Sequence, residues 1–116
     1  MPHCCIEYTP NVLEVIGQDE LLTTAHQAMI QSGLFGAIDV KTRATVVSDY
    51  ILGELALRTS GFIHIKIYLL SGRTVEQKHG LTHAVAQALR VKLPQLPSIT
   101  VDIIDMARDT YAKDVV

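Results

Sequence analysis

The segment GFIHIKIYLL, residues 61–70, constrains the fold more than any other part of the chain. Its apolar residues alternate with polar or aromatic ones, which is typical of a strand that buries a single face. The apolar face carries Ile63, Ile65, Ile67 and Leu69, and the other face carries Phe62, His64, Lys66 and Tyr68. The chain is therefore expected to contain a sheet with one apolar face and one mixed face.

The same alternation recurs near the start of the chain, in AIDVKTRATVV (37–47) and in SITVDIID (98–105). The predicted apolar face takes Cys4, Ile6 and Tyr8, then Ile38, Val40 and Val46, then Ile99, Val101 and Ile103. The predicted opposite face takes His3, Cys5 and Glu7, then Asp39, Lys41 and Arg43, then Thr100 and Asp102.

Two helical patterns separate these strands. Residues 19–33 carry an apolar stripe at helical spacing, begin with two acidic residues and stop at Gly33. Residues 74–94 carry a second stripe, and Thr74 with Gln77 has the spacing of a capping box. The stripes consist of Leu21, Leu22, Ala25, Ala28 and Met29, and of Leu81, Ala84, Val85, Ala88 and Leu89; Pro94 ends the second.

A strand, helix, strand unit thus occurs twice, in residues 2–47 and 61–106, within one expected domain. This order predicts an α/β fold (α+β by some schemes), with two βαβ units in a four-stranded sheet and both helices on one face. The other face is either solvated or packed against further subunits. Residues 48–60 fit a helix turn, an edge strand or a loop.

Composition excludes several classes of function. Aromatic residues make up 5% of the chain and Trp is absent, which argues against base stacking, and a net charge of −2 without a basic patch argues against nucleic acid or an anionic membrane. We expect a cytoplasmic protein, because no signal peptide or membrane-spanning run is present. Adjacent Cys4 and Cys5 would point to opposite faces and act as small apolar residues.

Pro2 is the first candidate for chemistry. Removal of Met1 would give Pro2 a secondary amine, held by the first strand, whose pKa burial or nearby cations would lower toward that of a useful general base. The alternative is that Pro2 merely begins the strand, where no ladder donor is needed.

Arg73 is the second candidate, since it directly precedes the second helix and could hold a carboxylate by two hydrogen bonds; alternatively it is a solvated loop arginine. Lys41 and Arg43 share a strand face and form either a second cationic site or ion pairs with nearby carboxylates. His79 and His83 have metal-binding spacing, but HGLTH lacks the Glu of zinc hydrolases, so a polar helix face is favoured. We expect neither a metal nor a cofactor.

With these features assembled, the sequence resembles the tautomerase superfamily, and within it the 5-carboxymethyl-2-hydroxymuconate isomerase family. The similar pieces are MPHCCIEY, SGLFGAIDVKTRA, FIHIKIYLLSGRT and DTYAK. The resemblance implies a cofactor-free isomerase of small unsaturated 2-hydroxy or 2-oxo acids in aromatic catabolism. Pro2 would be its general base and acid, and Arg73 would bind a carboxylate. It also implies a homotrimer with sites between neighbouring subunits.

One position departs from the family pattern. Lys41 stands where a second substrate-binding arginine is expected, while Arg43 is kept; lysine retains the charge but loses the two-point fit to a carboxylate. The rival hypothesis is a non-catalytic ferredoxin-like domain that binds a small molecule or regulates. That fold orders its strands differently and commonly dimerises.

Overall fold

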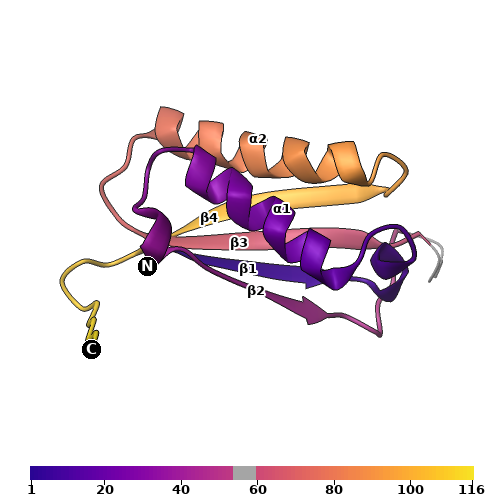
Figure 1. The fold of residues 1–116 in the computed structure, drawn as a ribbon, viewed down its shortest axis with the longest axis horizontal. Coiled ribbons are helices and arrows are strands. Elements are labelled where there is room, and N and C mark those ends of the chain that lie inside the picture. The colour runs from indigo at the N-terminus through magenta and orange to yellow at the C-terminus, as the bar shows by residue number, and fades with distance from the viewer. Residues whose placement is uncertain (54–59) are drawn as a thin grey trace.

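The computed structural model describes residues 1–53 and 60–116. In these residues four strands form one sheet: β1 (His3–Tyr8), β2 (Lys41–Val46), β3 (Phe62–Leu70) and β4 (Ser98–Met106). The helices are α1 (Gln18–Gln31) and α2 (Val75–Lys92), with short 3-10 turns η1 (Pro10–Glu14) and η2 (Ala37–Asp39). Both helices cover the same face of the sheet (Figure 1). Residues 54–59 of the undecided segment 48–60 lie outside the described residues.

The strand order is β2-β1-β3-β4. β1 runs parallel to β2 and β3 runs parallel to β4, while β1 and β3 pair antiparallel in the middle of the sheet. The predicted fold of paired βαβ units with both helices on one face is therefore confirmed. The order excludes the ferredoxin-like arrangement, whose split βαβ units place another strand between the two parallel ones.

The core lies between the sheet and the helices. The four alternating residues of β3 have no solvent exposure, and Cys4, Ile6 and Tyr8 of β1 are buried beside them. Burial of each large aliphatic side chain contributes about 1.5–3 kcal/mol. The helices complete the core with Leu21, Ala25, Ala28 and Met29 of α1 and Leu81, Val85 and Leu89 of α2.

Three details of the predicted pattern are wrong. Ile38 is 95% exposed and Asp39 is not in a strand, because η2 occupies residues 37–39 and β2 begins only at Lys41. Ala84 is exposed, since it lies roughly a quarter turn from the centre of the α2 stripe. Val46 is 46% exposed at the end of edge strand β2.

The remaining side chains form what we call the helix-free face. It is defined by alternate residues of the four strands: His3, Cys5, Glu7, Lys41, Arg43, Phe62, His64, Lys66, Tyr68, Thr100, Asp102 and Ile104. Register places Arg43, Cys5, Lys66 and Asp102 in one row across the sheet. Charges of both signs are thus neighbours on this face.

The capping box at α2 is present as predicted. The Gln77 N–H donates to Thr74 Oγ1 over 3.1 Å, and the Thr74 N–H donates to Gln77 Oε1 over 2.9 Å. These bonds satisfy two end groups of the helix and fix the direction of the preceding residue, Arg73. In the part of the chain that the structure describes, neither helix is long and apolar enough to cross a bilayer.

Candidate active site

Pro2 is buried and anchored at the start of an inner strand. Its carbonyl oxygen accepts a hydrogen bond of 3.0 Å from the Lys41 N–H, which extends the parallel pairing of β1 with β2. The antiparallel partner β3 flanks β1 on its other side. Here the nitrogen of Pro2 belongs to the peptide bond with Met1, so the free amine is that of Met1.

Met1 lies between η2 and the end of β3. Its amino group donates to the Asp39 main-chain oxygen over 3.3 Å, and its thioether sulfur accepts the Leu70 N–H at 3.3 Å. Burial lowers the pKa of this α-amino group below its ordinary 8.0, and the charges of Lys41 and Lys113 lower it further, whereas Asp39 opposes them. A lowered pKa increases the fraction of neutral amine near pH 7, which is the form that accepts a proton.

Arg73 reaches the same place from the loop before α2. Its Nη2 donates to the Leu34 carbonyl over 3.0 Å, and its Nη1 lies 3.5 Å from the Leu70 carbonyl. The guanidinium carbon stands 4.8 Å from the centre of the Phe35 ring, a cation–π distance. Leu70 therefore contacts Met1 through its N–H and Arg73 through its carbonyl. A guanidinium has five N–H donors, so these contacts leave others for a ligand.

Lys41 and Arg43 both lie on the helix-free face of β2. Lys41 is the first strand residue, next to the N-terminus, whereas Arg43 is two residues further along, with Nη1 3.1 Å from His3 Nδ1. Within residues 1–53 and 60–116 neither forms an ion pair with a carboxylate. The nearby carboxylate of Asp39 is paired with Lys113 instead.

The structure thus brings three of the four sequence candidates together. Pro2, Lys41 and Arg73 lie at one end of the sheet, and we call this group, with Met1, Asp39 and Leu70, the N-terminal site. Arg43 lies beside it on the helix-free face. Sequence reasoning missed Asp39, which was assigned to a strand face, and Lys113. The DTYAK piece already contained Lys113, but periodicity gave no reason to place it here.

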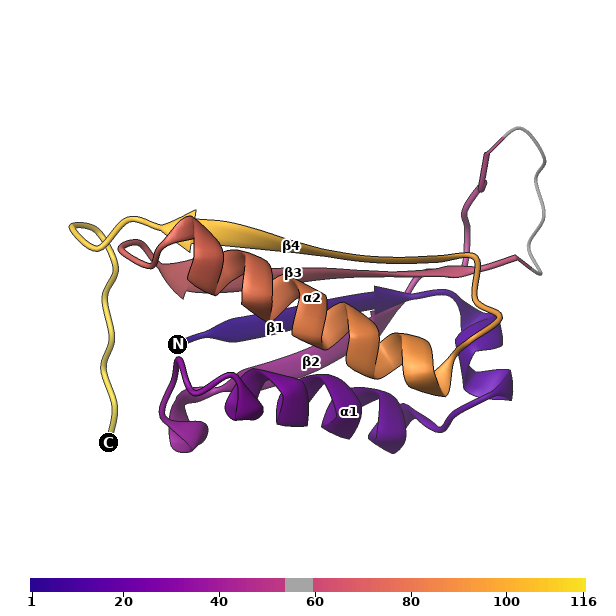
Figure 2. The ribbon, with the colours of Figure 1, turned by 90° about the horizontal axis from the view of Figure 1, so that it is seen from above.

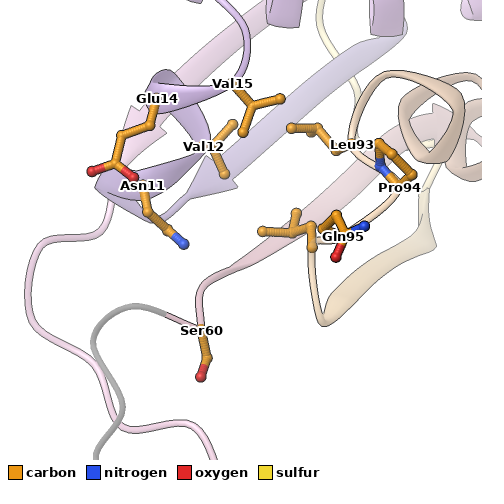
Figure 3. A pocket seen from close by; sticks show the side chains of 9 residues that line it. Asn11, Val12, Glu14, Val15, Ser60, Leu93, Pro94 and Gln95 are labelled. Atoms are coloured by element: carbon orange, nitrogen blue, oxygen red, sulfur yellow. The ribbon is translucent and has the colours of Figure 1, made fainter.

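An apolar cavity of about 260 Å³ lies at the opposite end of the sheet, between η1 and the turn after α2 (Figure 3). Val12, Val15 and Leu93 point into it, and its only charged lining residue among the described ones is Glu14. A negative side chain repels carboxylates, so this cavity does not suit the ligand that the cations of the N-terminal site would attract.

The two histidines of α2 and the two cysteines of β1 lie outside the N-terminal site. The rings of His79 and His83 lie 3.9 Å apart, exposed on α2, and the described residues contain no group of three or more potential metal ligands. Both cysteines are free. Burial raises the pKa of the Cys4 thiol to about 12, so Cys4 is a core residue rather than a nucleophile.

Two parallel strand pairs, β2 with β1 and β3 with β4, are joined by the antiparallel pairing of β1 with β3, and this arrangement is a tautomerase-like fold. The profile of a family described as 5-carboxymethyl-2-hydroxymuconate isomerase matches residues 2–101. The chain belongs to this family, and the isomerase class follows from that membership.

Solved structures support the fold. A 5-carboxymethyl-2-hydroxymuconate isomerase from Deinococcus radiodurans R1 is similar with a TM-score of 0.84 and 23% identity, over 97% of this chain and 88% of that one. A 5-carboxymethyl-2-hydroxymuconate delta-isomerase gives 0.79 and 16%, over 100% and 89%. A fused 4-OT symmetric trimer gives 0.75 and 19%, over 96% and 90%. No curated protein matches the sequence.

Proposed function

We propose that the protein is a cofactor-free tautomerase that moves a proton within a small unsaturated 2-hydroxy or 2-oxo acid, with Pro2 as general base and then general acid. The observation that carries this proposal is the terminal amine itself. It is partly buried, lies beside Lys41 and has a lowered pKa. Removal of Met1 transfers the free amine to Pro2, one residue further into the same site.

The proton follows a short route in this mechanism. The neutral Pro2 amine takes a proton from the hydroxyl of a dienol acid, the electron pair shifts along the diene, and the ammonium returns the proton to a carbon atom. Arg73 orients a carboxylate through paired N–H groups. Lys41 or Arg43 holds a second carboxylate or stabilises the negative charge that develops on the substrate oxygen. This proton transfer needs neither a redox step nor a cofactor.

Lys41 affects which substrates the site could bind. A lysine ammonium contacts a carboxylate as a point charge, without the planar fork of an arginine. We propose enols with at least two carboxylates, related to 5-carboxymethyl-2-hydroxymuconate (which has three) and derived from the breakdown of aromatic compounds, as the substrate class. The match to the isomerase family supports this choice.

We also propose a homotrimer in which the helix-free faces of three subunits meet. Phe62, Tyr68 and Ile104 lie on this face among charges of both signs, so contact between copies would bury apolar area and pair the charges. A structural neighbour with the same fold is a symmetric trimer. Sites at the ends of the sheets would then lie near subunit boundaries.

Substitution of Pro2 by alanine tests the mechanism. The variant should lose at least about 100-fold in kcat/KM for ketonisation of 2-hydroxymuconate, followed by ultraviolet absorbance, because general acid–base catalysis contributes factors of about 10²–10⁴. Intact mass must show that Met1 is removed from both proteins, and sedimentation must show the same assembly. Equal rates for the two would end the proposal. Wild-type protein that binds the enol without ketonising it would instead favour a ligand-binding domain.

A further inference from the structure

The segment after β4 returns to the N-terminal site. Both ribbon views place the C-terminus at the same end of the molecule as the N-terminus (Figure 2). Arg108 Nε donates to the Ser71 carbonyl over 2.7 Å, which ties the start of this segment to the loop that carries Arg73. Further along, Lys113 Nζ lies 3.5 Å from Asp39 Oδ1. The Asp39 main-chain oxygen in turn accepts the hydrogen bond of the terminal amine.

We propose that Lys113 is a further substrate-binding residue of this site, and that it exchanges Asp39 for the second carboxylate of a dicarboxylic substrate. The inference rests on the proposed tautomerase function and deepens it. Arg73 would hold the first carboxylate and Lys113 the second. Lys41 is then left to stabilise the charge that develops on the substrate oxygen.

The ion pair of Lys113 is suited to such an exchange. Its side chains are 48% and 42% exposed and its atoms are 3.5 Å apart, whereas Lys78 and Asp105 lie only 2.6 Å apart. Exposed ion pairs contribute little net stability, because water competes with both partners. A substrate carboxylate can therefore replace Asp39 without a large cost to the fold.

The net charge of the site also supports a substrate with two carboxylates. The positive charges of Lys41 and Lys113 and the negative charge of Asp39 act on the terminal amine. Arg73, which contacts the Leu70 carbonyl, adds a third positive charge to the site. A substrate with two carboxylates would neutralise the remaining excess. The position of Lys113 near the amine also explains why its charge contributes to the lowered pKa of that group.

The kinetic test uses matched lysines and matched substrates. Lys113→Gln should raise KM for 2-hydroxymuconate about tenfold, the lower end of what a hydrogen bond between charged groups contributes. KM for 2-hydroxypenta-2,4-dienoate, which has one carboxylate, should change little. Lys113→Arg should restore most of the loss. Lys78→Gln also removes an ion-paired lysine, but from α2, and should match wild type. An equal effect on both substrates, or no effect, would overturn the inference.

A binding test separates this inference from the function on which it rests. Muconate and sorbate are matched diene acids with two and one carboxylates, and neither has an enol to ketonise. By calorimetry on the mature protein, Lys113→Gln should weaken muconate about tenfold and leave sorbate nearly unchanged. If the variant loses muconate affinity as expected but the wild-type protein does not ketonise 2-hydroxymuconate, only the proposed function would be refuted. Equal muconate affinity in wild type and variant would refute the role of Lys113.

Discussion

His3 shows how single residues respond to the charges around the N-terminal site. It lies between Lys41 and Tyr68 in register, and its Nδ1 faces the Arg43 guanidinium, which can only donate. Nδ1 is therefore the acceptor and the neutral ring carries its proton on Nε2. Burial lowers the pKa of His3 below its ordinary 6.5, and the charges of Arg43, the N-terminus and Lys41 add to this.

This shift predicts how stability depends on pH. Below pH 6.5 the unfolded chain protonates His3 more readily than the folded protein does, so the free energy of unfolding falls as pH decreases toward the folded pKa. His3→Gln should remove this contribution, and the difference from wild type is measurable by urea unfolding at about pH 7.5 and about pH 5.5. Arg43→Gln should weaken the dependence as well. Parallel pH profiles for wild type and His3→Gln would contradict the prediction.

At the scale of elements, the start of α2 connects stability with the site. The capping box ends the loop that carries Arg73, and the guanidinium then joins that loop to the segment after α1 through the Leu34 carbonyl. Loss of the cap would leave end groups of the helix without partners. Its effect should therefore reach both the helix and Arg73, the residue that we propose binds a carboxylate.

Thr74→Ala should lower the free energy of unfolding by about 1 kcal/mol, the usual cost of an N-cap hydroxyl. Thr82→Ala is the matched control, because its hydroxyl donates to the His79 carbonyl inside the same helix and caps nothing. It should cost less than about 0.5 kcal/mol in urea unfolding. Similar losses for both variants would show that the cap has no special role.

The elements differ in how far the sequence predicts them. The strict alternation of buried and helix-free-face residues predicts β1 and β3, and the capping-box spacing of Thr74 and Gln77 predicts the start of α2. The 3-10 turn at residues 37–39 escaped this reasoning, because Ile38, Asp39 and Val40 imitate the alternation of a strand. A hydrogen bond of 3.0 Å from the Asp39 N–H to the Gly36 carbonyl closes this turn, and a Cβ added at Gly36 would lie 3.1 Å from the Asp39 carboxylate.

The site depends on contacts that no local pattern encodes. Pro2 and Arg73 were identified from their positions at the starts of a strand and a helix. The contact of Met1, the residue before Pro2, with Leu70 and the pairing of Asp39 with Lys113 join residues far apart in the chain. The contact of Met1 with Leu70 continues the antiparallel register of β1 and β3, which sequence periodicity does not determine.

At the scale of the whole molecule, the sheet has one covered and one uncovered face. Both helices lie on the same side, so neither helix covers the helix-free face (Figure 1). Among the described residues, Tyr50 contacts this face at Phe62, with ring centroids 5.6 Å apart. Tyr68 and Ile104 are direct neighbours on it, and Arg43, Cys5 and Lys66 lie in the next row. Copies of the chain are the occupants that we propose for this surface.

Sedimentation should therefore give about three times the chain mass of 12.8 kDa. Ile104→Asp should dissociate the assembly, because it would bury an unpaired charge within the proposed contact. Val91→Asp is the control, since Val91 is 68% exposed on α2 and should leave the trimer intact. A monomeric wild type, or equal dissociation by both variants, would contradict the proposed interface.

The position of Pro2 on an inner strand has a consequence for how the protein can be handled. The hydrogen bond from Lys41 to the Pro2 carbonyl holds the start of β1 in place, and the sheet forms with Met1 still attached. Under the proposed mechanism, a peptide fused upstream would leave the fold intact and keep the proline nitrogen as an amide. Such a fusion would be a latent enzyme, and a single cut before Pro2 would activate it.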